Sequence, residues 1–148
     1  MEGDFHPGWS GGRFKALETT ADVGVVAEGP SLPAALASAA AGFYWVVTPG
    51  QAAEGSERAA VSGKGEDIGT ALARALQQLV VEFDTRGFVG ASCLAAILQG
   101  ERVEVRLELR GERFDAARHP QGVEVKAVTH HALKVERSPP RVEVLFDI

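Results

Sequence analysis

Residues 66–83 limit the fold of this chain most, because their apolar side chains recur with the period of an α-helix. One stripe of the helix would hold Ile68, Ala71, Leu72, Ala75, Leu76, Leu79, Val80 and Phe83. Acidic residues at the start of the segment suit the positive end of a helix dipole. The pattern predicts a helix that begins at Glu66 or Asp67 and packs by this stripe into the core.

A further helix is predicted earlier in the chain. Ser31 is a suitable N-cap, and Pro33 is tolerated in a first helical turn. Apolar residues then recur at helical spacing from Leu32 to Val47, and Pro49-Gly50 ends the segment.

The rest of the chain is rich in strand patterns. Residues 102–110 alternate between charged and apolar side chains, which is typical of an antiparallel strand with one face in solvent. Further strands are predicted at residues 14–17, 23–27, around 61, 91–98 and 141–148. We therefore predict an α+β fold in which two main helices pack on a mainly antiparallel β-sheet.

Length and glycine content set the domain organisation. The chain has 148 residues, 45% of them hydrophobic, which is the size of one ordinary domain. Gly and Pro interrupt residues 1–13, and this predicts a flexible N-terminal tail. Residues 14–148 are predicted to form a single domain.

Titratable residues gather in residues 111–131, which we interpret as a hairpin. After a polar connection, Gln121-Gly122 restarts an extended segment whose side chains alternate between two faces. The more apolar face holds Val123, Val125, Ala127 and Thr129. Lys126 falls on the less apolar face with Val128 and His130, where a cation can meet an anion. His119, His130 and His131 are most simply surface or hydrogen-bonding residues.

Charge and cysteine content narrow the classes of partner and compartment. A formal net charge of -5 disfavours a broad nucleic-acid-binding face, which needs clustered Lys and Arg. The single cysteine, Cys93, forms no internal disulfide and is expected to be a small buried residue. No apolar run has membrane-spanning length and no secretory signal is recognisable, so we expect a soluble cytoplasmic protein.

Two carboxylates stand at strand ends, Asp22 at the entry of one strand and Asp147 beside the last residue. With the terminal carboxylate of Ile148 they form a candidate all-oxygen site for a hard cation such as Mg²⁺ or Ca²⁺. Spacing alone does not single out such a site, and Asp22 is equally explained as a turn or capping residue. The sequence has no phosphate-binding loop, zinc motif or nucleophile elbow.

Four ordered segments resemble the archease family. Thr20-Ala21-Asp22-Val23 resembles its Thr-Ala-Asp motif, and residues 83–88 resemble the Phe-Asp-Thr-x-Gly-Phe segment after its long helix. Residues 111–131 resemble its central hairpin, and Phe146-Asp147-Ile148 its terminal Phe-Asp-Ile. Thr19 stands where the family usually has His, so no role of that histidine is carried over.

The resemblance implies a single archease-like domain and an accessory role. Archease-like proteins activate an RtcB-type RNA ligase in tRNA splicing or RNA repair, promoting its GTP-dependent guanylylation and repeated turnover without being enzymes themselves. By position, the resemblance implies that Asp22, Asp147 and Ile148 bind a divalent cation, Mg²⁺ or Ca²⁺. Lys126 would contact the partner, while GTP and RNA would be bound through the ligase.

Two other classes of function stay open on the residues alone. A metal-dependent phosphohydrolase would use Asp22 and Asp147 to hold a cation that activates water. A general chaperone or protein-binding module would use the same carboxylates only to cap turns.

Overall fold

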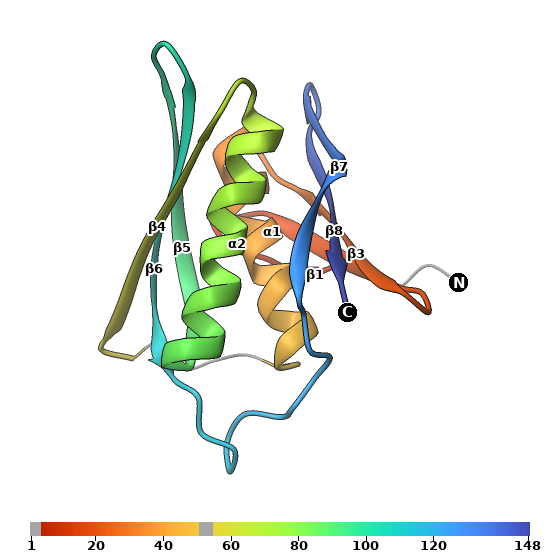
Figure 1. Ribbon diagram of the computed structural model, residues 1–148, viewed down its shortest axis with the longest axis vertical. Helices are drawn as coiled ribbons and strands as arrows, with labels where there is room; N and C mark the ends of the chain where they lie inside the picture. The colour runs from red at the N-terminus through yellow and green to blue at the C-terminus, as the bar shows by residue number, and fades with distance from the viewer. Residues whose placement is uncertain (1–3, 51–54) are drawn as a thin grey trace.

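Two helices lie between two antiparallel sheets in the computed structural model of this chain (Figure 1). The structure describes residues 4–50 and 55–148, and only the backbone at positions 131 and 132. In chain order the elements are β1 (His6–Pro7), β2 (Arg13–Glu18), β3 (Asp22–Glu28), α1 (Leu32–Val47), β4 (Glu57–Gly65), α2 (Ile68–Arg86), β5 (Phe88–Gln99), β6 (Val103–Arg113), β7 (Ala127–Arg137) and β8 (Pro140–Asp147).

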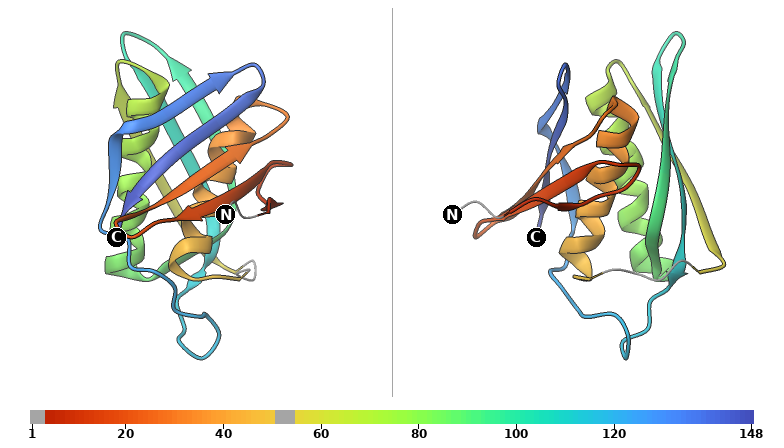
Figure 2. Two further views of the ribbon diagram at one scale, coloured as in Figure 1. Left: turned by 90° about the vertical axis from the view of Figure 1, so that its right-hand side faces the viewer. Right: turned by 180° about the vertical axis from the view of Figure 1, so that it is seen from behind.

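The predicted α+β class is confirmed, and the strands divide into two sheets. One sheet has the order β1-β2-β3-β8-β7 and the other the order β4-β6-β5. Both helices are sandwiched between them, as the view from behind shows (Figure 2). The core therefore lies in the two layers where the helices meet the inner faces of the sheets.

Helix α2 forms where the apolar stripe predicted it. Leu72, Leu76 and Leu79 are fully buried. The Asp67 carboxylate caps the first turn by accepting a hydrogen bond from the Thr70 N–H at 2.8 Å. Gly87 ends the helix in the left-handed region, with φ 64°, where a residue without a Cβ fits best. The segment of residues 83–88 is thus a helix end leading into β5.

Helix α1 also begins as predicted, since the Ser31 hydroxyl accepts a hydrogen bond from the Ala34 N–H at 3.2 Å and proline follows in the first turn. Unlike α2, it is buried on nearly every side. Its run of alanines explains this, because small side chains let both sheets approach the same helix.

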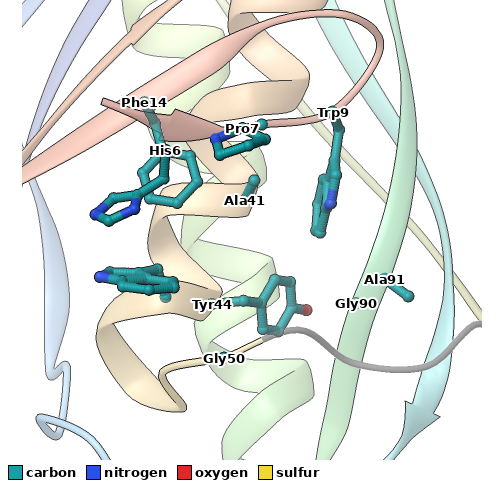
Figure 3. A pocket seen from close by; sticks show the side chains of 11 residues that line it. His6, Pro7, Trp9, Phe14, Ala41, Tyr44, Gly50, Gly90 and Ala91 are labelled. Carbon is teal, nitrogen blue, oxygen red and sulfur yellow. The ribbon is translucent and has the colours of Figure 1, made fainter. Parts of the chain in front are cut away.

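The segment predicted as a flexible N-terminal tail packs against the rest of the domain at residues 6–13, while residues 1–3 lie outside the described part. Strand β1 pairs with β2, and the His6 ring stacks on Trp45 at a centroid distance of 4.3 Å. The Ser38 hydroxyl accepts a hydrogen bond from the Trp9 N–H at 3.2 Å and donates one to the Trp9 carbonyl at 3.0 Å. His6 and Trp9 lie across helix α1 from each other in Figure 3. Aromatic contacts with α1 offset the flexibility that Gly and Pro confer locally.

The predicted hairpin over residues 111–131 is also wrong. Strand β6 belongs to the three-stranded sheet and β7 to the five-stranded sheet, so residues 114–126 form a crossover between them (Figure 1). Alternation within a strand does not reveal which strand it pairs with, and here β7 pairs with β8. None of the described helices is long and apolar enough to cross a membrane.

The Asp67 cap predicts a pH-dependent contribution to stability. The hydrogen bond from the Thr70 N–H holds the pKa of Asp67 below its ordinary value. The cap therefore stabilises the fold above the unfolded-state pKa of about 3.9, and this contribution is lost as the pH falls through the folded-state pKa. Asp67→Ala should lower the free energy of unfolding by about 1 kcal/mol at neutral pH.

Urea denaturation over a pH series measures this difference. It should shrink in acid, whereas Asp67→Asn, which keeps an acceptor oxygen, should stay close to wild type at neutral pH. Equal stability of wild type and Asp67→Ala at neutral pH would contradict this account of the cap.

Candidate functional site

The antiparallel pairing of β3 with β8 places two carboxylates opposite each other. Asp22 and Asp147 are register partners, and the next pair along, Val23 and Phe146, is buried. Successive side chains alternate between faces, so both acids lie on the face turned away from the helices. Directly opposed Cβ atoms are about 4.5–5.5 Å apart, close enough for both carboxylates to bind one ion.

Threonine hydroxyls hold both carboxylates. The Thr19 hydroxyl donates to Oδ1 of Asp22 at 2.7 Å, and the Thr129 hydroxyl donates to Oδ1 of Asp147 at 2.9 Å. Within the part of the chain that the structure describes, the other oxygen of each carboxylate accepts no hydrogen bond. Each acid is therefore oriented through one oxygen and has a second one available.

Lys126 lies beside the same pair. Its backbone N–H donates to the Asp147 carbonyl at 2.8 Å, and its side chain is exposed. The predicted faces of this segment are partly reversed, because Val128 is buried opposite Phe146. Thr129, expected on the apolar face, is the residue that contacts Asp147.

The crossover reaches Lys126 by way of the C-terminal end of helix α1. The Thr48 hydroxyl donates to the Pro120 carbonyl at 2.6 Å. The N–H groups of Gly122 and Val123 donate to the carbonyls of Val47 and Val46, both at 2.9 Å. The two backbone bonds satisfy carbonyls at the end of helix α1, and all three bonds fix the path of the crossover past that helix.

His119 belongs to the crossover and is buried, and of the two predicted alternatives it is the hydrogen-bonding residue. Its Nδ1 accepts a hydrogen bond from the Asp115 N–H at 2.8 Å, so the ring proton is on Nε2. Nε2 then donates to Oε1 of Glu112 at 2.5 Å, and the ring stacks on Phe114. This histidine holds the crossover in shape. His130 is exposed, and the side chain of His131 lies outside the described part.

Ile148 lies at the same end of the five-stranded sheet as the two acids. Its N–H donates to the Ala21 carbonyl at 3.4 Å, and its side chain packs against the core. The structure thus brings together all four predicted site residues, Asp22, Lys126, Asp147 and Ile148, at one end of the five-stranded sheet.

The carboxylate oxygens of Asp22 and Asp147 are suitable ligands for a hard cation, but two side chains are too few to complete its coordination. Carboxylate oxygens are the ligands that Mg²⁺ and Ca²⁺ prefer, and Mg²⁺ commonly uses one or two protein carboxylates with water and substrate phosphates. Among the described residues, no group of three or more His, Cys, Asp or Glu side chains is placed to hold a metal. Any ion held by Asp22 and Asp147 would need further ligands from the main chain, water or another molecule.

The two threonines are the part of this site that sequence reasoning missed. In the sequence, Thr19 stands out only as a departure from the family pattern, and alternation places Thr129 on the apolar face. Thr19 is only three residues before Asp22, so a local hydrogen bond between them could be expected from the sequence. Thr129 is eighteen residues before Asp147, and the sequence gives no indication that the two are in contact. A short turn in which the Thr19 hydroxyl bonds to Asp22 is the one feature of this pair that the sequence could have indicated.

Other reactive groups of the chain lie elsewhere. Burial raises the pKa of the Cys93 thiol to about 12, so it stays protonated and behaves as the buried residue that was predicted. The hollow in Figure 3 is a cavity of about 360 Å³ between the N-terminal segment and α1, lined by His6, Trp9 and Tyr44 among others. None of the paired-carboxylate residues lines it.

Fold and site together define a small α+β protein with two helices between antiparallel sheets and paired acids at one sheet end. Residues 14–148 match the Archease protein family (MTH1598/TM1083). The chain belongs to the archease family.

Individual relatives support the same assignment. The protein named archease from Pyrococcus abyssi is 31% identical over 128 residues, covering 86% of this chain and 90% of the relative. The archease of Aeropyrum pernix is 33% identical over 135 residues, covering 88% and 94%. The solution structure of Methanobacterium thermoautotrophicum protein 1598 superposes with a TM-score of 0.73 at 26% identity, covering 91% of this chain and 98% of that one.

Two opposed carboxylates predict a cost in stability. Like charges directly opposite each other on neighbouring strands destabilise a sheet by about 0.2–1 kcal/mol. In EDTA at low salt, Asp147→Asn should therefore raise the free energy of unfolding by a similar amount, since the amide oxygen can still accept from Thr129.

Glu101→Gln, which removes an exposed charge from the turn between β5 and β6, is the matched control and should change stability less. Urea denaturation of the three proteins decides the matter. If Asp147→Asn is less stable than wild type without a divalent cation, the acids do not repel each other in the fold.

Proposed function

We propose that this protein activates an RtcB-type RNA ligase in tRNA splicing or RNA repair, without being an enzyme itself. The proposal rests on family membership and on one observation: Asp22, Asp147 and Lys126 meet at one exposed sheet end. Activation would consist of promoting guanylylation of the ligase from GTP and permitting repeated turnover.

The paired acids are the part of the surface that we assign to cation binding. Asp22 and Asp147 would each offer the oxygen not bonded to a threonine, while Thr19 and Thr129 keep the carboxylates oriented. A bound Mg²⁺ or Ca²⁺ would supply positive charge that neutralises phosphate oxygens. The shortage of protein ligands suits an ion that is completed by the phosphates or by the partner.

Lys126 would provide the first contact with an anionic group. Its exposed ammonium is a compact point charge on a flexible stem, suited to a phosphate or to a carboxylate of the ligase. The bond from its N–H to Asp147 ties the backbone at this position to the paired acids. A group bound by Lys126 would therefore lie at the same end of the sheet as the acids.

Net charge supports docking to a basic partner. The chain is acidic, with a formal charge of -5, whereas the active site of an enzyme that binds GTP and RNA must attract phosphates. Electrostatic complementarity of this kind speeds association and orients the encounter. RNA and GTP would then be bound by the ligase and not by this chain.

The test is GTP-dependent guanylylation of a cognate ligase, followed with the ligase limiting. Wild-type protein should accelerate guanylylation and support multiple turnovers of RNA joining. Asp22→Asn should lose most of this stimulation because one of the two opposed carboxylates is gone. Lys126→Ala should weaken it chiefly at low protein concentration, because it removes a docking charge.

Glu101→Gln is the matched control, and it should stimulate the ligase like wild type. Full stimulation by folded Asp22→Asn and Lys126→Ala would refute the site. No stimulation by wild type would refute the function. Hydrolysis of phosphoesters by the pure protein, abolished by EDTA, would instead indicate a phosphohydrolase, and metal-independent suppression of aggregation would indicate a chaperone.

A further inference from the structure

Strand β5 is an edge strand without the usual protection against pairing. It lies at one edge of the three-stranded sheet, and its twelve residues include no Asp, Glu, Lys, Arg or Pro. Leu94 is 71% exposed and Leu98 39% exposed, and both lie on the solvent face with Ala96. Long, apolar, uncharged edges are templates for another strand.

Two other strand edges of this fold are protected. On β4, the Gln78 side chain of α2 donates to the Ser62 carbonyl at 2.7 Å, and Arg74 donates to the Lys64 carbonyl at 2.5 Å. On β7, the Val128 N–H donates to the Gln77 side chain at 2.9 Å. Both strands also contain charged residues. Polar helix side chains and charges thus cover β4 and β7.

Among the residues that the structure describes, the part of the β5 edge that no other segment covers is a short window. In an antiparallel pair, backbone groups of successive residues point alternately toward and away from the partner strand. The Cys93 carbonyl points away from β6, because it accepts a hydrogen bond from the Ser10 hydroxyl at 2.9 Å. The outward groups after it belong to Ala95, Ile97 and Gln99, and the turn toward β6 begins at Gly100. The window of residues 94–98 therefore lies between Ser10 and this turn.

We propose that this window pairs with the same window of a second copy of the chain, antiparallel about a two-fold axis through Ala96. Ala95 of one copy and Ile97 of the other would exchange both backbone hydrogen bonds, giving about four bonds in all. Leu94 would lie opposite Leu98 on the outer face, and Ile97 opposite Ala95 on the inner face.

Charge and shape favour a second copy over a different protein. The chain carries a formal charge of -5, and the window has no charged residue, so pairing two copies through it brings no like charges into contact. Centred on Ala96, the window is self-complementary: leucine meets leucine, and the larger isoleucine meets the smaller alanine. With the two-fold axis at Ala96, the Ser10 contact and the turn at Gly100 of each copy both lie outside the paired residues.

The dimer would form away from the paired acids. Strand β5 belongs to the three-stranded sheet and the acids to the five-stranded sheet, and the β5–β6 hairpin extends past the helix ends (Figure 2). Each copy would keep its own Asp22 and Asp147 accessible. The proposal is independent of the ligase-activating function.

A cysteine at the two-fold axis tests the register. Ala96 would face its own copy at a non-hydrogen-bonded position, where Cα atoms are about 4.5 Å apart, within the range that a disulfide spans. Mild oxidation of Ala96→Cys should give a covalent dimer on a non-reducing gel. Val81→Cys, at an exposed apolar position of α2, should give much less, and native Cys93 is buried.

A proline tests the pairing itself. Ala95→Pro removes an outward N–H that bonds to none of the described residues of the single chain, so the fold should be retained. Sedimentation equilibrium should show dimers for wild type and Val81→Cys under reducing conditions, and monomers for Ala95→Pro. A monomeric wild type, a dimer that survives Ala95→Pro, or equal crosslinking of the two cysteine variants would overturn the proposal.

Discussion

Helix α2 is the element on which the rest of the structure depends, because it joins the two sheets. Leu72, Leu76 and Leu79 are fully buried, and burial of each such side chain contributes about 1.5–3 kcal/mol. Its polar residues act at the same time on both sheets: Gln78 bonds to β4 and Gln77 to β7. A surface helix would leave these residues in water. Here they satisfy backbone groups that would otherwise be unpaired at strand edges.

Local periodicity was sufficient to predict the elements and insufficient to predict their pairing. The stripe of α2, the cap at Ser31 and the alternation in β6 all depend on neighbours in sequence, and all three were confirmed. The hairpin at residues 111–131 and the loose packing of residues 6–13 were wrong, because each depends on distant partners. His6 needs Trp45, and the crossover needs the carbonyls at the end of α1.

The candidate site shows the same division. Asp22 and Asp147 were proposed from residue type and family resemblance, and only the register of β3 with β8 shows that they face each other. Thr129 was assigned to an apolar face because a period of two does not say which face is buried. The pair of like charges is a local conflict in a fold that is otherwise consistent, and such conflicts are commonly found at functional sites.

We propose that these opposed acids hold a divalent cation, and calorimetric titration of the metal-free protein with Mg²⁺ and Ca²⁺ tests this most directly. The account predicts saturable binding by wild type and by Glu101→Gln, and loss of that binding in the double variant Asp22→Asn, Asp147→Asn. Binding that is unchanged in the double variant, or no binding by wild type, would contradict it.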